Sequence, residues 1–204
     1  MHGKANSMRL FRTMIRRSDS IQRTTFLFYY RGIVHAKKGD NDLAIQDLDE
    51  ANLGSKDAQT FVRRADVYFA KGNYDQAMRD CDHAIGLDPA YAPAFQRRGV
   101  LFRFGEEFER AIENFNRALY FNPNFALAFY GRGLTYSNNG EYDLAIADYN
   151  SALQLQPDWA RALYGRGVAK LKKGDSIGGN ADMATATKIQ ADVAEDFARL
   201  RGRL

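Results

Sequence analysis

The sequence repeats itself with a period of 34 residues, and this repetition restricts its fold more than any other feature. Prolines mark the period, because three of the four stand 34 residues apart, at Pro89, Pro123 and Pro157. Counted from the third residue after each proline, copies begin at Ala58, Ala92, Ala126 and Ala160, and an earlier copy of 33 residues begins at Thr25. Such a chain is an array of similar units, each of which buries its apolar face against its neighbours.

Each copy has the pattern of two helices joined by a turn. Large apolar residues alternate with small ones at helical spacing, and alanine or glycine occupies positions 8, 20 and 27 of every copy, where two helices would approach closely. A proline ends the second helix in three copies, because it lacks an N–H and clashes with the preceding turn. The turn between the two helices contains a glycine, at Gly39, Gly72, Gly105, Gly140 and Gly174. The predicted fold class is all-α, built of helical hairpins.

With this period, these small residues and the proline at position 32, the copies resemble the tetratricopeptide repeat family. The resemblance covers residues 25 to about 190 and implies a right-handed superhelical α-solenoid of five hairpins with terminal capping helices. The expected repeats are 25–57, 58–91, 92–125, 126–159 and 160–190. Residues 191–204 are expected to form a C-terminal capping helix, with Val193, Phe197 and Leu200 on one apolar face.

The fifth copy departs from the others. Lys170 stands at the otherwise aromatic or histidine position 11, and a pair of glycines, Gly178 and Gly179, stands at the start of the second helix. Because glycine weakens a helix, that helix is expected to be shorter or displaced.

Position 7 of every copy is an arginine, and position 23 is an aspartate in four copies and an asparagine in one. Burying an unpaired charge is costly, and a planar guanidinium suits bidentate pairing with a carboxylate. We therefore predict a structural ladder of pairs, with the acid in the same repeat or in the preceding one. The alternative is a row of arginines that binds an acidic ligand. The residues concerned are Arg31, Arg64, Arg98, Arg132 and Arg166, with Asp47, Asp80, Asn114, Asp148 and Asp182.

The first helices of such a solenoid line its concave surface, which is the binding surface of these proteins. By resemblance to the family, positions 2, 5, 6, 9, 12 and 13 face this groove. The predicted partner-binding residues there are Tyr29, Tyr30, Arg63, Phe69, Gln96, Arg97, Arg103, Phe104, Tyr130, Arg161 and Tyr164. Aromatic residues and arginine carry much of the energy of interfaces, so we expect a protein or peptide partner with acidic character or a free carboxylate. The alternative is that these are ordinary solvated helix faces.

The sequence has no pattern that indicates catalysis. Its three histidines are scattered, its one cysteine, Cys81, stands at a core position, and no nucleophile, metal-ligand or phosphate-binding motif is recognisable. We therefore expect a protein that is not an enzyme, without cofactor or metal. A single cysteine favours a reducing compartment, and a cytoplasmic location is expected. The predicted function is that of a scaffold or adaptor.

The N-terminal segment, residues 1–24, differs from the rest in charge. It carries a net charge of +5 within a chain of +4, so the remaining residues sum to −1 and nucleic-acid binding is not expected. Residues 8–17 separate apolar side chains from arginines at helical spacing. This segment is interpreted as a cap on the first repeat, a membrane-surface helix or a transit peptide. The rival functions are accordingly a membrane-associated assembly factor and a self-associating module, and the oligomeric state stays open.

Overall fold

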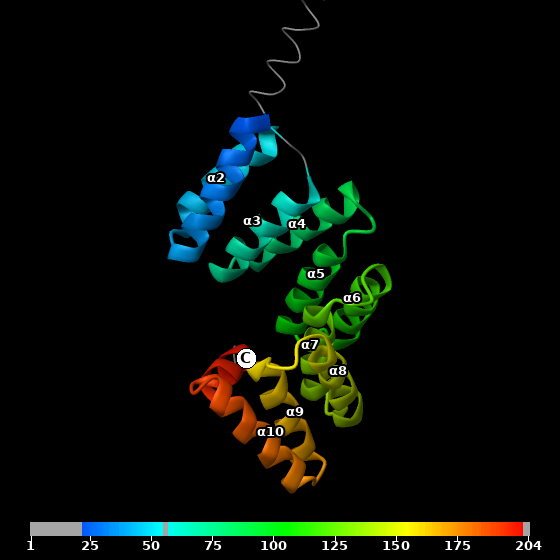
Figure 1. The fold of residues 1–204 in the computed structure, drawn as a ribbon. Coiled ribbons are helices and arrows are strands. Elements are labelled where there is room, and N and C mark those ends of the chain that lie inside the picture. The colour runs from blue at the N-terminus through cyan, green and yellow to red at the C-terminus, as the bar shows by residue number, and fades with distance from the viewer. Residues whose placement is uncertain (1–21, 55–56, 202–204) are drawn as a thin grey trace, which may run out of the picture. The chain divides into compact units, whose positions relative to one another are not determined.

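The computed structural model describes residues 22–54 and 57–201. Within these ranges the chain is a succession of antiparallel helices (Figure 1), which confirms the all-α solenoid of helical hairpins. A helix over residues 22–38 comes first. It is followed by α2 (Asn41–Gly54), α3 (Ala58–Ala70), α4 (Tyr74–Leu87), α5 (Ala92–Phe104), α6 (Phe108–Phe121), α7 (Ala126–Asn138), α8 (Tyr142–Leu155), α9 (Ala160–Lys172), α10 (Ser176–Ile189) and α11 (Val193–Arg201). The predictions made for residues 8–17 lie outside the described residues.

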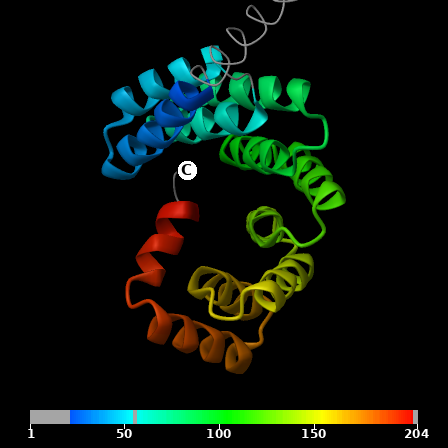
Figure 2. The same cartoon turned by 45° about the horizontal axis from the view of Figure 1, so that its top comes forward.

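The chain divides into two compact units, residues 1–89 and 90–204. Unit 1 contains the helix over 22–38 and α2 to α4. Its core includes Ala44, Leu48 and Val67. Unit 2 contains α5 to α11, and Figure 2 shows its helices following one another in antiparallel pairs. Each unit is a short stack of hairpins with its own core.

Small residues allow the two helices of each hairpin to pack closely, as the column of glycine and alanine indicates. A Cβ atom added to Gly99 would lie 3.1 Å from the Phe115 ring and 3.2 Å from the Ala111 carbonyl oxygen. A Cβ atom added to Gly133 would likewise lie 3.1 Å from the Tyr149 ring. These aromatic rings are fully buried. Because each glycine lacks a side chain, it leaves room for a large core side chain from the second helix of the hairpin.

The second helix of the fifth repeat is neither short nor broken. α10 has 14 residues, as many as α4, α6 and α8, so the expected shortening is wrong. Asp175 caps its first turn by accepting a hydrogen bond from the Gly178 N–H at 2.9 Å. A Cβ on Gly167 would lie 2.8 Å from the Gly179 carbonyl oxygen, against 3.2 Å at the equivalent contact of Gly99. The second glycine thus lets α10 pack more closely on α9.

The turn of the third repeat differs from the other four. Gly39, Gly72, Gly140 and Gly174 have positive φ angles of 84°, 78°, 82° and 93°. In the third repeat the glycine lies one residue earlier, and Glu106 takes the left-handed conformation with φ 59°. Gly105 itself has φ −84°, so the left-handed residue of this turn is the glutamate and not the glycine.

Because a side chain disfavours left-handed backbone by about 1 kcal/mol, replacing Glu106 with glycine is expected to stabilise unit 2 by about that amount. Thermal unfolding of the Glu106→Gly variant measures the change. Glu109→Gly, which places glycine inside α6, is the control and is expected to destabilise. A lower melting temperature for Glu106→Gly would show that this turn is not strained.

None of the described helices is long and apolar enough to cross a membrane.

Candidate functional site

The arginine at position 7 and the acid at position 23 of the same repeat are joined by paired hydrogen bonds. Arg132 donates from Nε and Nη2 to the two carboxylate oxygens of Asp148, both at 2.7 Å. Arg166 and Asp182 have the same geometry, with both distances 2.7 Å. Bidentate bonds also join Arg31 to Asp47 and Arg64 to Asp80, and Arg98 donates to Asn114 at 2.7 Å. Each pair ties the first helix of a hairpin to the second.

A further acceptor from the preceding repeat completes three of these pairs. Nη1 of Arg64 donates to Asp49 at 2.5 Å, that of Arg132 to Asn116 at 2.5 Å, and that of Arg166 to Asn150 at 2.8 Å. Asp49, Asn116 and Asn150 all stand at position 25 of their repeats. The arginine therefore bonds both within its repeat and to the one before it, which answers the alternative that the sequence left open.

The arginine side chains that contact a preceding repeat are more buried than the one in the first repeat. The side chains of Arg64, Arg132 and Arg166 are 19%, 21% and 20% exposed, whereas that of Arg31, in the first repeat, is 60% exposed. Four of the five arginines also lie over the phenylalanine three residues earlier, at 5.1 to 5.8 Å from the ring centroid. The guanidinium groups of Arg64, Arg132 and Arg166 thus lie in the interior of the stack, whereas that of Arg31 is open to solvent.

The surroundings move the pKa of Asp148 and Asp182 in opposite directions. Burial raises the pKa of Asp148 and outweighs the bonds from Arg132. Burial also acts to raise the pKa of Asp182, but the bonds from Arg166 and from Lys170, whose Nζ lies 2.9 Å away, outweigh it and lower the pKa. The lysine that breaks the pattern at position 11 is a second cation for this carboxylate.

Replacing Lys170 with methionine is therefore expected to raise the pKa of Asp182. A carboxylate whose pKa is lowered by folding adds stability above its unfolded pKa of about 4, and this stability is lost as the pH falls through the folded pKa. The variant should lose part of this stability, and its acid unfolding should begin at a higher pH. Carboxyl NMR titration measures the pKa directly, with Lys172→Met as the neighbouring control. An unchanged pKa would show that Lys170 does not act on Asp182.

In unit 1 three of the predicted binding residues, Tyr29, Tyr30 and Arg63, line two open pockets between the helix over 22–38 and α3, the second of which also touches α2. A pocket of about 350 Å³ is lined by Phe26, Tyr29 and Tyr30 together with residues at the start of α3. A second pocket, of about 280 Å³, has a mostly apolar lining with Lys37, Arg63 and Asp66 at its edge. Arg63 lies 3.5 Å from Asp66, so part of its charge is balanced within α3. Phe69 packs on Tyr74 of α4, with ring centroids 5.4 Å apart.

An exposed apolar stripe runs along the helix over 22–38. Phe26, Tyr30 and Val34 are 61%, 50% and 49% exposed and stand four residues apart, which places them on one face. The rings of Phe26 and Tyr30 touch, with centroids 4.3 Å apart. Sequence reasoning selected Tyr29 and Tyr30 but missed Phe26 and Val34, although their spacing was the available signal.

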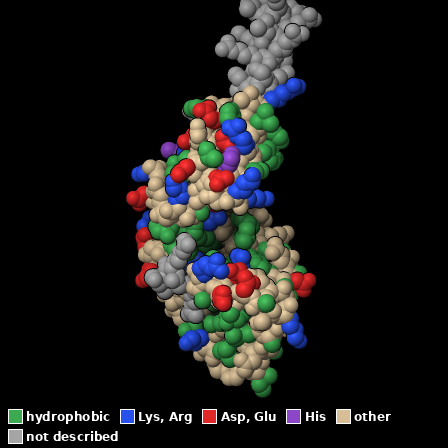
Figure 3. All heavy atoms as spheres, turned by 90° about the vertical axis from the view of Figure 1, so that its left-hand side faces the viewer, with side chains coloured by type: hydrophobic (Ala, Val, Ile, Leu, Met, Phe, Trp, Pro, Cys, Tyr) green, Lys and Arg blue, Asp and Glu red, His purple; other side chains and the backbone are tan. Residues whose placement is uncertain are grey.

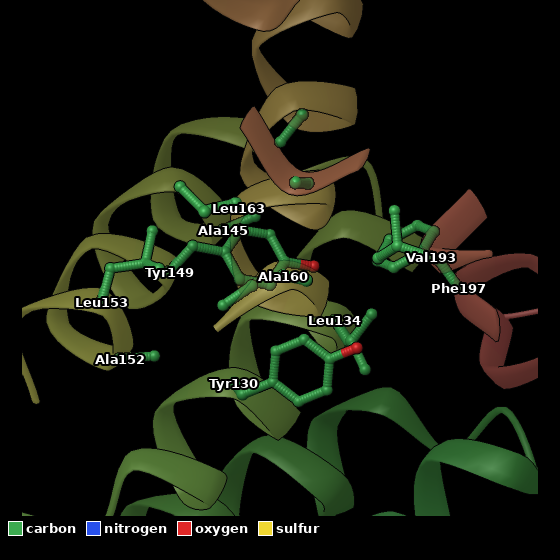
Figure 4. Close-up of a cluster of buried hydrophobic side chains, with 13 residues drawn as sticks. Tyr130, Leu134, Ala145, Tyr149, Ala152, Leu153, Ala160, Leu163, Val193 and Phe197 are labelled. Carbon is green, nitrogen blue, oxygen red and sulfur yellow. The ribbon is translucent and has the colours of Figure 1, made fainter. Parts of the chain in front are cut away.

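In unit 2 the structure corrects two predicted groove residues. Arg103 and Tyr130 are only 5% and 7% exposed, so neither lines an open groove. Tyr130 packs on Trp159, with ring centroids 4.6 Å apart, and belongs to the core cluster that includes Val193 and Phe197 of α11 (Figure 4). Gln96, Arg97, Phe104, Arg161 and Tyr164 are half-buried. The cause is α11, which the sequence did not place over this surface.

Charges on the exposed surface are mixed. On the face drawn in Figure 3, basic and acidic side chains lie interspersed among apolar ones. Among the described residues, no group of three or more histidine, cysteine and acidic side chains could hold a metal ion. Cys81 is fully buried.

Comparison with known proteins identifies the repeat. Models of the tetratricopeptide repeat match residues 58–91 and 126–158, and a further model of this repeat matches 101–140. A search of curated proteins gives no significant match.

Among solved structures, MamA shares 26% identity with the chain over 84% of its length and 94% of MamA, with a TM-score of 0.64. TTC0263, a thermophilic repeat protein of Thermus thermophilus, is 19% identical over 86% of this chain and 98% of that one, with a TM-score of 0.73. YrrB, a repeat protein with an unusual peptide-binding site, is 20% identical over 84% and 90%, with a TM-score of 0.60. The chain belongs to the tetratricopeptide repeat family, and its architecture is that of a protein-binding scaffold.

Proposed function

We propose that the chain is a non-catalytic adaptor that holds an acidic or carboxylate-bearing peptide, or the matching part of a partner protein, on the first-helix surface of unit 1. The exposed stripe of Phe26, Tyr30 and Val34 carries this proposal. Exposed apolar patches on soluble proteins tend to mark interaction sites, and tyrosine and arginine are frequent hot-spot residues.

The preference for an acidic ligand is supported by the charges beside the stripe. Lys37 and Arg63 border the pocket of about 280 Å³, together with Asp66. Two cations face one acid there, so a ligand carboxylate would leave the local charges balanced. The apolar lining of the same pocket would accept an aliphatic or aromatic side chain of the peptide.

Affinity capture from a lysate tests the proposal with a Tyr30→Ala/Arg63→Ala double variant. Loss of a hot-spot residue costs about 2 kcal/mol or more, so the double variant is expected to bind its partner at least about thirtyfold more weakly than the wild type. Arg79→Ala, which changes an exposed arginine on α4, is the control and should capture the same partner as the wild type. Equal capture by the wild type and the double variant would exclude this surface as the binding site. Capture of further copies of this chain alone would indicate self-association instead.

A further inference from the structure

The last helix of unit 2, α11, is not placed as the next helix of the stack. In the regular repeats each first helix packs closely against the second helix before it, as α7 does on α6 and α9 on α8. By contrast, α11 packs mainly on α9 and only slightly on α10. Ile177 and Ile189 of α10 remain 88% and 45% exposed. The helix therefore covers mainly the α9 side of the last hairpin and leaves part of α10 exposed.

It lies instead on the side formed by the first helices. The helices α5, α7 and α9 contact one another in succession, and within the described residues no comparable contact joins α6, α8 and α10. The first helices thus line the inner side of unit 2. Phe197 packs on Tyr164 of α9, with ring centroids 5.3 Å apart, and a Cβ on Gly165 would lie 3.0 Å from its ring.

The apolar face of α11 is the part that is buried. Val193 and Phe197, four residues apart, are 0% and 3% exposed, and they belong to the core cluster that also contains Tyr130 (Figure 4). An amphipathic helix that inserts residues spaced by four into a groove is a common mode of peptide recognition. In unit 2 the helix so bound belongs to the chain itself.

Two arginines of the first helices make polar contacts with α11. Asp196 lies 3.5 Å from Arg161 of α9. Arg103 of α5 donates from Nη1 to the Leu200 carbonyl oxygen at 3.4 Å and lies over Phe104, 4.8 Å from the ring centroid. Arg103 is 5% exposed, and in the part of the chain that the structure describes no carboxylate lies within ion-pair distance of it. Burial of the guanidinium group lowers the pKa of Arg103.

A carboxylate is a stronger partner for a guanidinium than a carbonyl oxygen. A helix that ended in a carboxylate at the place of the Leu200 carbonyl would therefore satisfy Arg103 better than α11 does. With nine residues, α11 is also too short to be a stable helix on its own. It therefore gains its helical structure from its contacts with this surface.

We propose that the inner surface of α5, α7 and α9 is a binding site for an amphipathic helical peptide that ends in a carboxylate, and that α11 occupies the site until such a peptide displaces it. This inference rests on the proposed function, because it supplies a second ligand surface for the same adaptor. The tethered helix competes with an effective concentration in the millimolar range, so the site is closed to weak ligands.

The test uses the full chain and two synthetic peptides that copy residues 190–200, one with a free C-terminal carboxylate and one with an amide. Binding of fluorescent peptides is measured by anisotropy to the wild type and to Phe197→Ala, which weakens the docking of α11. The carboxylate peptide is expected to bind Phe197→Ala at least tenfold more tightly than the wild type. It is also expected to bind this variant about tenfold more tightly than the amide does. Asp196→Lys, which removes the contact with Arg161, opens the site independently should Phe197→Ala not fold.

Equal affinity of the carboxylate peptide for the wild type and for both opened variants, or no binding to any of them, would overturn the proposal. Equal affinities of the two peptides would overturn the assignment of a carboxylate to Arg103. Concentration-dependent dimers of the wild type that vanish in Phe197→Ala would assign the site to α11 of a second copy. Peptide binding to unit 2 without partner capture by the unit 1 surface would reject the proposed function alone. Partner capture by the unit 1 surface without peptide binding to unit 2 would reject this inference alone.

Discussion

Replacing Arg132 with methionine is expected to lower the free energy of unfolding of unit 2 by about 3 kcal/mol. The substitution removes both bonds to Asp148, whose side chain is 7% exposed, and leaves a buried carboxylate without its cation. Removing one partner of a buried pair costs about 3–5 kcal/mol, and the lower end applies because Arg132 is 21% exposed. Denaturant unfolding followed by circular dichroism measures the change.

Two control variants make this result specific to the ladder. Arg31→Met removes the equivalent bonds at a side chain that is 60% exposed, and its effect should be much smaller. The double variant Arg132→Met/Asp148→Leu removes both charges and should recover a large part of the lost stability. If Arg31→Met destabilises the chain as much as Arg132→Met, burial by the preceding repeat does not determine the strength of these pairs.

Replacing Tyr149 with alanine is expected to cost about 4 kcal/mol. Its ring is fully buried, and it fills the space left by two glycines of the first helices, Gly133 and Gly165. Added Cβ atoms there would lie 3.1 and 2.8 Å from the ring. Because neither glycine can fill the cavity, the space would stay open, and large cavities are what make such substitutions costly.

The matched control is Tyr120→Ala on α6, because this tyrosine is 76% exposed. Its substitution should change the free energy of unfolding by less than about 0.5 kcal/mol. Thermal and denaturant unfolding of the two variants gives the comparison. Similar losses at Tyr149 and Tyr120 would contradict the packing described for unit 2.

Most of the fold could be predicted from the sequence because the same residue types recur wherever the repeats make the same contacts. The small residue at position 8 and the alanine at position 27 recur because every hairpin has the same helix approach. The ladder could be predicted for the same reason. An arginine at position 7 of every repeat needs a partner, and the acid or amide at position 23 recurs with it. The acceptor at position 25, as in Asp49 and Asn116, was missed, although the column was open to the same comparison.

The features that occur once could not be found in this way. The position of α11 depends on contacts with Tyr164 and Arg103, which are distant in sequence and have no counterpart in other repeats. The pattern of Val193 and Phe197 showed an apolar face but not the surface that it covers. For the same reason Arg103 was predicted as an exposed groove residue and is buried. The turn at Glu106 likewise has no equivalent among the other copies.

Amide hydrogen exchange of the full chain distinguishes most directly between α11 as a displaceable ligand and α11 as a structural part of the stack. If α11 occupies a binding site, Phe197→Ala should raise the exchange of amides in α11 to that of an unstructured peptide. Protection in α5, α7, α9 and α10 should stay as in the wild type. If α9 and α10 lose their protection together with α11, the helix is an integral cap, and the account of a ligand-binding surface in unit 2 is contradicted.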